Sequence, residues 1–74
     1  MPKLPAITPE ELVAILLKRG FVLDRTRGSH RIYYHLESKR RVVVPFHRGD
    51  LPRGTLLEIL RRAGLTKDEF GELR

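Results

Sequence analysis

The chain has 74 residues and a formal net charge of +6, so we expect one small domain with a polyanionic partner. So small a domain has little room for a deep pocket, which argues against an enzyme with a large cofactor, and the lack of cysteine excludes disulfides and thiolate metal sites. No apolar run is long enough to span a bilayer and no signal peptide opens the sequence, so we expect a cytoplasmic protein without membrane partners.

The positive charge is concentrated in the middle of the chain. From Lys18 to Arg62 there are twelve Lys or Arg residues against four acidic residues, a local balance of +8. Further acidic residues gather near the two ends, at Glu10, Glu11, Asp68, Glu69 and Glu72. We therefore expect the middle of the chain to provide the surface that binds a polyanion.

A first helix is expected over Pro9 to Arg19. Thr8 can cap this helix, and Glu11 completes the capping-box pattern. Gly20 is typical of the left-handed residue that follows a helix end. Residues 1–7 contain two prolines and are expected to form an extended lead-in.

Two strands joined by a tight turn at Gly28 are expected next. Phe21 to Thr26 alternates in hydropathy, which predicts a half-buried strand, and His30 to Leu36 alternates again. The second strand's core-facing residues are expected to be Ile32, Tyr34 and Leu36. Its outward-facing residues are expected to be Arg31, Tyr33 and His35. The same alternation places His30 on the core side, at the strand end.

A third strand and a second helix complete the pattern. Arg41 to Val44 contains three consecutive valines, and Pro45 ends the strand. After a loop, Asp50 is expected to cap a helix that ends at Gly64. Residues 66–74 form a short C-terminal extension that begins with a second capping-box pattern and allows a further turn of helix.

The order of these elements predicts the fold class. Short connections favour an antiparallel three-stranded sheet, and two amphipathic helices can cover one of its faces. We therefore predict a single α+β domain over residues 1–74 with the order α-β-β-β-α. This is the architecture of double-stranded-RNA-binding domains, which bind RNA by its shape and through its phosphates.

His30 is the candidate catalytic residue. It lies in the stretch from Arg27 to Arg31, where an imidazole that titrates near neutral pH is flanked by guanidinium groups that bind phosphate. The alternative is a hairpin turn whose polar residues only contact water. Tyr33 is expected to be exposed and able to stack on a base, although an ordinary surface tyrosine fits equally well. The expected RNA contacts are Arg25, Arg27, Ser29, Arg31, Tyr33, Lys39, Arg40, Arg41, Arg48 and Arg53.

The other histidines do not predict a metal site. No His-x-x-x-His pair lies on an expected helix, so we expect the protein to bind neither metal nor cofactor. His35 is expected on the outward face of its strand, and His47 is expected in a surface loop.

A series of motifs resembles the HicA toxins, also called YcfA-like proteins. The motifs are Gly28-Ser29-His30, Val44-Pro45 followed by His47, the run from Asp50 to Leu56, and the run from Ile59 to Leu65. The resemblance extends from about Thr8 to Leu65. It implies an mRNA interferase with a fold like that of double-stranded-RNA-binding domains, inhibited by a HicB antitoxin, with the family's catalytic histidine at His30.

Three hypotheses follow. The first is a metal-independent endoribonuclease in which His30 acts as general base on a ribose 2′-hydroxyl, with Tyr33, His47 or water as the general acid. The second is a non-catalytic RNA-binding module of the same fold. The third is a domain that binds only another protein. The expected partners are mRNA and a HicB-like antitoxin.

Overall fold

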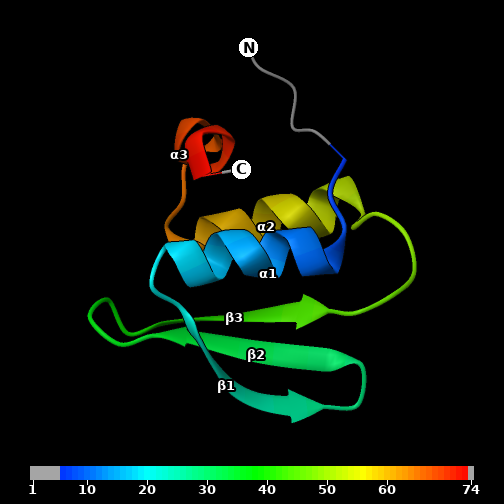
Figure 1. Cartoon of the computed structure of the whole chain (residues 1–74), viewed down its shortest axis with the longest axis horizontal. Helices are drawn as coiled ribbons and strands as arrows, with labels where there is room; N and C mark the ends of the chain where they lie inside the picture. The colour runs from blue at the N-terminus through cyan, green and yellow to red at the C-terminus, as the bar shows by residue number, and fades with distance from the viewer. Residues whose placement is uncertain (1–5, 74) are drawn as a thin grey trace.

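The computed structural model describes residues 6–73, which form one helix, three strands and two further helices (Figure 1). In chain order the elements are α1 (Pro9–Lys18), β1 (Val22–Arg27), β2 (His30–His35), β3 (Arg40–Pro45), α2 (Arg53–Ala63) and α3 (Lys67–Leu73). The predicted α+β class and the α-β-β-β-α order are confirmed, with α3 following α2. Of the predicted lead-in, residues 1–5 lie outside the described part of the chain.

The ends of the helices follow the predicted local signals. The Glu11 amide donates to the Thr8 hydroxyl at 3.2 Å, and the Thr8 amide donates to the Glu11 carboxylate at 2.9 Å, which completes the capping box of α1. Gly20 follows α1 with φ +100°, and Gly64 ends α2 with φ +74°. Both values lie in the left-handed region that glycine adopts without a steric penalty, so each glycine can terminate its helix.

The sheet is antiparallel with the order β1-β2-β3, and α1 and α2 lie on the same side of it (Figure 1). Leu12 and Leu16 of α1 and Ile59 of α2 are buried together with Val42 of β3. Burial of these apolar side chains holds the layers together. We call the other side of the sheet, which neither helix covers, the open face. Within residues 6–73, no helix is long and apolar enough to cross a membrane.

The structure reverses the predicted faces of β2. Tyr33 is 2% exposed and pairs with the buried Val42, whereas Tyr34 and Ile32 are only partly buried. Paired residues on neighbouring strands project to the same side of a sheet. Val42 and Val44 of β3 are buried and Val43 is exposed, so the residues of β2 that pair with Val42 and Val44 face the helices. Because β2 has apolar residues at consecutive positions, its own sequence did not determine which of them faces the helices.

The prediction that β1 is half-buried is also wrong, because every residue of β1 is exposed. Phe21, just before the strand, is 2% exposed and belongs to the core, whereas Leu23, within the strand, is 51% exposed. The pairing with β2 shifts register between Leu23 and Arg25, so Asp24 forms a β-bulge. β1 is the edge strand farthest from α2 (Figure 1). The helices therefore do not bury its side chains.

Asp50 does not cap α2, contrary to the prediction. The residue at the N-cap position is Pro52, which makes no side-chain capping bond, and the helix begins at Arg53. The Leu51 amide donates instead to the Ile7 carbonyl at 2.8 Å, and both side chains are buried. This contact joins the loop before α2 to the segment before α1, so tertiary packing sets the start of the helix.

The C-terminal extension is part of the core. The Glu69 amide donates to the Thr66 hydroxyl at 3.1 Å, which confirms the second capping pattern, and Phe70 is 1% exposed. The Arg19 guanidinium lies 2.9 Å from the Glu69 carboxylate, and Lys18 Nζ donates to the Leu73 carbonyl at 3.2 Å. The extension therefore packs against the end of α1.

Candidate functional site

The open face is organised in three rows that cross the sheet. Strand pairing sets these rows, because directly opposed residues project to the same side. From the β1–β2 turn towards the other end, the rows are Arg27–His30–Pro45, Arg25–Ile32–Val43 and Val22–Tyr34–Arg41. The face therefore combines guanidinium groups, one imidazole, one phenol ring and apolar surface.

His30 lies at the turn end of the open face. Gly28 makes the turn with φ +58°, and the Phe46 amide donates to the Ser29 carbonyl at 2.7 Å, which fixes the backbone just before His30. The His30 side chain is exposed and makes no hydrogen bond or ion pair to another residue between 6 and 73. The predicted core-side position is therefore wrong. The imidazole is instead available to a ligand.

Asp24 and Arg41 meet on the open face beside Tyr34. Arg41 Nη1 contacts Asp24 Oδ2 directly, and Arg25 Nε lies 3.5 Å from the same oxygen. The Arg41 guanidinium carbon also lies 4.7 Å from the centre of the Tyr34 ring. The sequence prediction missed Tyr34 as a surface group. No signal in the sequence identifies it, because Val42, Val43 and Val44 are consecutive and only their packing distinguishes the two faces.

Arg31 occupies the other side of β2 from His30. Its guanidinium carbon lies 4.1 Å from the centre of the Phe46 ring, a cation–π contact. Arg48 and Arg53 are exposed in the loop before α2 and at its first residue. These three arginines lie outside the rows of the open face.

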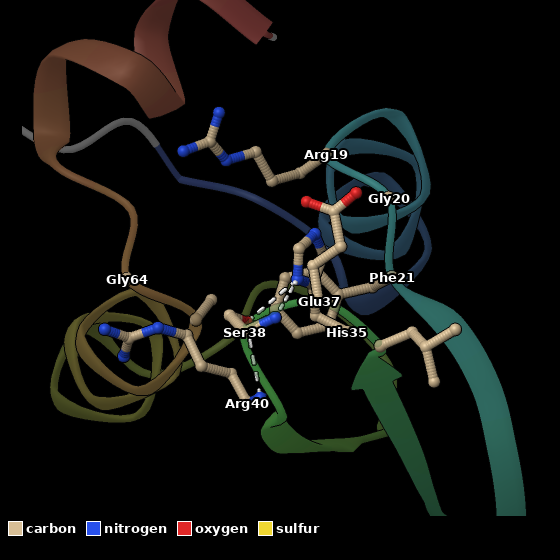
Figure 2. A pocket seen from close by; sticks show the side chains of 10 residues that line it. Arg19, Gly20, Phe21, His35, Glu37, Ser38, Arg40 and Gly64 are labelled. Carbon is tan, nitrogen blue, oxygen red and sulfur yellow. Dashed lines mark hydrogen bonds between the residues drawn. The ribbon is translucent and has the colours of Figure 1, made fainter.

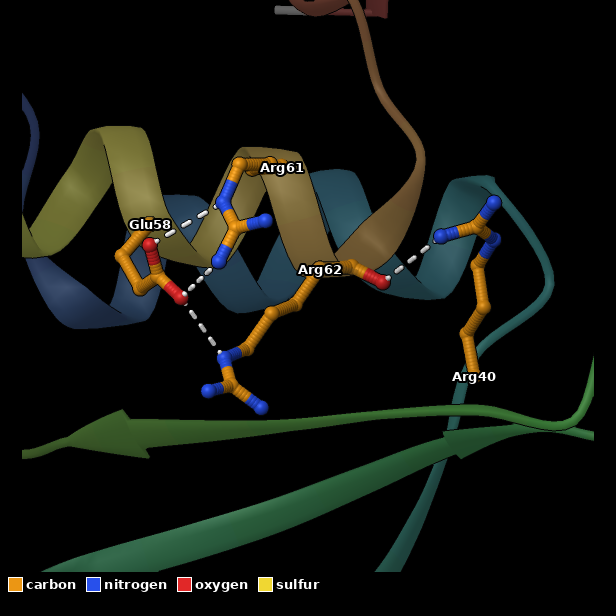
Figure 3. A network of polar contacts seen from close by, with 4 residues as sticks. All are labelled: Arg40, Glu58, Arg61 and Arg62. Carbon is orange, nitrogen blue, oxygen red and sulfur yellow. Dashed lines mark hydrogen bonds and ion pairs between the residues drawn. The ribbon is translucent and has the colours of Figure 1, made fainter.

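The basic run at the β2–β3 turn does not form one patch. Arg41 is on the open face, whereas Arg40 Nη1 donates to the Arg62 carbonyl at 3.2 Å (Figure 3). A Cβ atom added at Gly64 would lie 2.8 Å from Arg40 Nε, so this glycine leaves space for the guanidinium. Lys39 makes the turn with φ +60° and is exposed. The side chains of Arg40 and Arg41 therefore lie on opposite faces of the sheet.

His35 lies in a groove at the far end of β2 from His30 (Figure 2). The groove has a volume of about 730 Å³ and is lined by residues that include Arg19, Phe21 and Arg40. The His35 ring centre is 5.1 Å from that of Phe21, and its Nδ1 accepts a hydrogen bond from the Ser38 amide at 3.2 Å. The predicted outward position of His35 is therefore wrong, because the side chain is half-buried on the helix side.

A second cluster of charges is satisfied within α2. The carboxylate of Glu58 accepts hydrogen bonds from Arg61 at 2.7 Å and from Arg62 at 2.8 Å (Figure 3). These two bonds lower the pKa of Glu58 to about 2, and the bond from Arg61 has the larger effect. Both guanidinium groups are thus already engaged with a carboxylate.

Between residues 6 and 73, no three His, Cys, Asp or Glu side chains are grouped so that they could hold a metal ion.

Comparison with known proteins identifies the family. No curated protein matches this chain. The sequence profile of the HicA toxins of bacterial toxin–antitoxin systems matches residues 9–65, which include α1, the sheet and α2 but not α3. The match covers well over half of the chain, so this protein belongs to the HicA toxin family of bacterial toxin–antitoxin systems.

Proposed function

We propose that this toxin is an endoribonuclease that cleaves mRNA on the open face of its sheet, in the cytoplasm. The observation that carries the proposal is the position of His30, which is exposed and without a side-chain partner among residues 6–73. It shares a row with Arg27 and lies next to the row of Arg25. A free imidazole beside two guanidinium groups supplies a base and phosphate ligands in one place.

The proposed reaction is an attack within the RNA strand. Neutral His30 takes the proton of a ribose 2′-hydroxyl, and the 2′-oxygen forms a bond to the adjacent phosphorus. The bond from phosphorus to the 5′-oxygen breaks, and that oxygen takes up a proton. The products are a 2′,3′-cyclic phosphate and a 5′-hydroxyl. Arg25 and Arg27 bind the phosphate oxygens and stabilise the negative charge of the transition state.

His47 and water are the candidates for the group that protonates the leaving oxygen. Tyr33, the third candidate from the sequence, is 2% exposed and cannot approach a strand on the open face. His47 is exposed, and it comes two residues after Pro45, which pairs with His30. Its backbone is therefore held near the His30 end of the sheet.

The remaining predicted contacts are proposed to bind the phosphates of RNA, Ser29 by hydrogen bonding and the basic residues by charge. Ser29 precedes β2 and Arg31 lies at its start, while Arg48 and Arg53 lie before and at the start of α2. Lys39 is at the opposite turn. Such contacts with phosphates position a strand without reading its sequence. Arg40 Nη1 donates to the Arg62 carbonyl, and its exposed side chain remains a proposed phosphate contact.

The reaction predicts dependence on the 2′-hydroxyl and independence of metal. A labelled RNA with a single deoxyribose at a cleaved position should resist cutting at that position and be cut normally elsewhere. Cleavage should continue in EDTA, since the proposed steps use only side chains of the protein and water. The measurement is gel analysis of the fragments and of their end groups. Normal cutting at the deoxy position would contradict the mechanism.

A non-catalytic RNA-binding module is the second candidate function. The same arginines on the open face would serve it, and His30 would then be one more surface contact. The cleavage assay separates the two candidates, because a binding module retains the labelled RNA without producing fragments.

We also propose that the antitoxin is a HicB-like protein that covers the open face. Family membership implies an antitoxin, and a net charge of +6 favours an acidic partner surface, which speeds association. In the complex, the backbone amides around His30 should exchange hydrogen more slowly than in the free toxin. Unchanged exchange there, with cleavage nevertheless inhibited, would rule out inhibition by covering His30.

A further inference from the structure

An acidic side chain lies among the arginines of the open face. The Asp24 side chain is 30% exposed, contacts Arg41 directly and lies 3.5 Å from Arg25. A carboxylate on a surface that binds RNA repels phosphate, so its charge alone works against the proposed function. Its contacts indicate a different role.

The β-bulge and the arginine together span all three strands. Pairing passes from Leu23 directly to Arg25, so Asp24 is the extra residue and its side chain is redirected. Arg41 belongs to β3, passes over the ring of Tyr34 in β2 at 4.7 Å and reaches the carboxylate in β1. The carboxylate therefore fixes the guanidinium over the phenol ring.

A guanidinium held over an aromatic ring presents a plane on which a base can stack. Unpaired bases in RNA complexes stack on aromatic side chains and on arginine planes, whereas a duplex keeps the faces of its bases covered. Val22, which pairs with Tyr34, is 56% exposed, and Val43, in the neighbouring row, is 46% exposed. Tyr34 is on the same face as His30 and lies four residues further along β2, roughly 13 Å away at the usual rise per residue.

We propose that Tyr34 and Arg41 form a stacking platform for one unpaired base of the RNA, and that Asp24 is the positioning residue that holds Arg41 in this platform. The substrate is then single-stranded a few nucleotides from the cleaved bond. This inference rests on the proposed function, because it takes the ligand of the open face to be RNA.

The test is an abasic scan with an RNA that cannot be cut. The probe is a labelled single strand in which every ribose carries a 2′-O-methyl group, together with copies that each lack one base. The unmodified protein should bind one of these copies about ten-fold more weakly than the intact strand. It should also bind the intact strand more tightly than the duplex of the same sequence. This part of the test needs no variant.

Tyr34 variants identify the position at which the base stacks. Tyr34→Ala should bind the intact strand about ten-fold more weakly and should no longer distinguish the critical abasic copy. Tyr34→Phe keeps the ring and should keep both properties. Melting curves of each variant establish that loss of binding is not loss of fold.

Asp24→Asn distinguishes positioning from simple charge. If the carboxylate acts only by repelling phosphate, its removal tightens binding. If it positions Arg41, Asp24→Asn binds the intact strand about two- to five-fold more weakly and loses part of the sensitivity to the critical abasic copy. Glu37→Gln is the matched control, because Glu37 is exposed and has no ion pair within the described residues. It should bind as tightly as the unmodified protein or more tightly.

The outcomes separate this inference from the function on which it rests. If the unmodified protein binds no RNA of any kind, the proposed function is wrong and the platform has no ligand. If it binds RNA but no single abasic position matters, if it prefers the duplex, or if Asp24→Asn binds more tightly, the platform is wrong while the ribonuclease proposal stands.

Discussion

His30→Ala is expected to lower the rate of RNA cleavage by about 10²–10⁴-fold, the usual contribution of a general base. The side chain is exposed and has no side-chain partner among residues 6–73, so its removal opens no cavity. A surface change of this kind costs about 0.5 kcal/mol or less, so the melting temperature should stay within a few degrees. The measurements are single-turnover cleavage of a labelled RNA and a thermal melt.

The matched control is His35→Ala. His35 is on the same strand but on the helix side, at the other end, where it contacts Phe21 and Ser38. This variant should keep its cleavage activity while it remains folded, although lost packing and hydrogen bonding should lower its melting temperature. The proposed mechanism is wrong if folded His30→Ala still cuts at the normal rate.

Phe70→Ala is expected to cause the largest loss of stability among the changes considered for this protein. Phe70 is 1% exposed and belongs to the core cluster, although it lies beyond residues 9–65 that match the family. Truncating a buried phenylalanine usually costs about 3–5 kcal/mol. In a domain of this size each kcal/mol lowers the melting temperature by roughly 4–8 °C, so a fall of more than about 10 °C is expected.

The control for this change is Glu72→Ala, an exposed position on the same helix. It should alter the free energy of unfolding by no more than about 0.5 kcal/mol. Both variants are measured by urea unfolding and by thermal melts. If Phe70→Ala unfolds at the same temperature as the unmodified protein, α3 does not complete the core, and the extension is instead an independent appendage.

Local chemistry in the sequence determined the turns of this protein and the ends of its helices, except the start of α2. The capping box at Thr8 and Glu11, the left-handed glycines at Gly20 and Gly64, and the turn at Gly28 act within a few residues of their own positions. Their effects do not depend on distant parts of the chain, so they can be recognised in the sequence alone. The same holds for the order α-β-β-β-α and for the identification of His30 as the candidate base.

Only the tertiary structure decided which side chains share a face. Tyr33 and Tyr34 are adjacent and chemically identical, and the pairing of Tyr33 with the buried Val42 determines which of them enters the core. The β-bulge at Asp24 and the contact of Arg41 with it join residues from two strands that are not neighbours in the sheet. Strand register and helix packing are non-local, and a shift of one residue exchanges the two faces of a strand. The sequence therefore determined the elements and the candidate base, and the packing of helices on the sheet decided which residues surround that base.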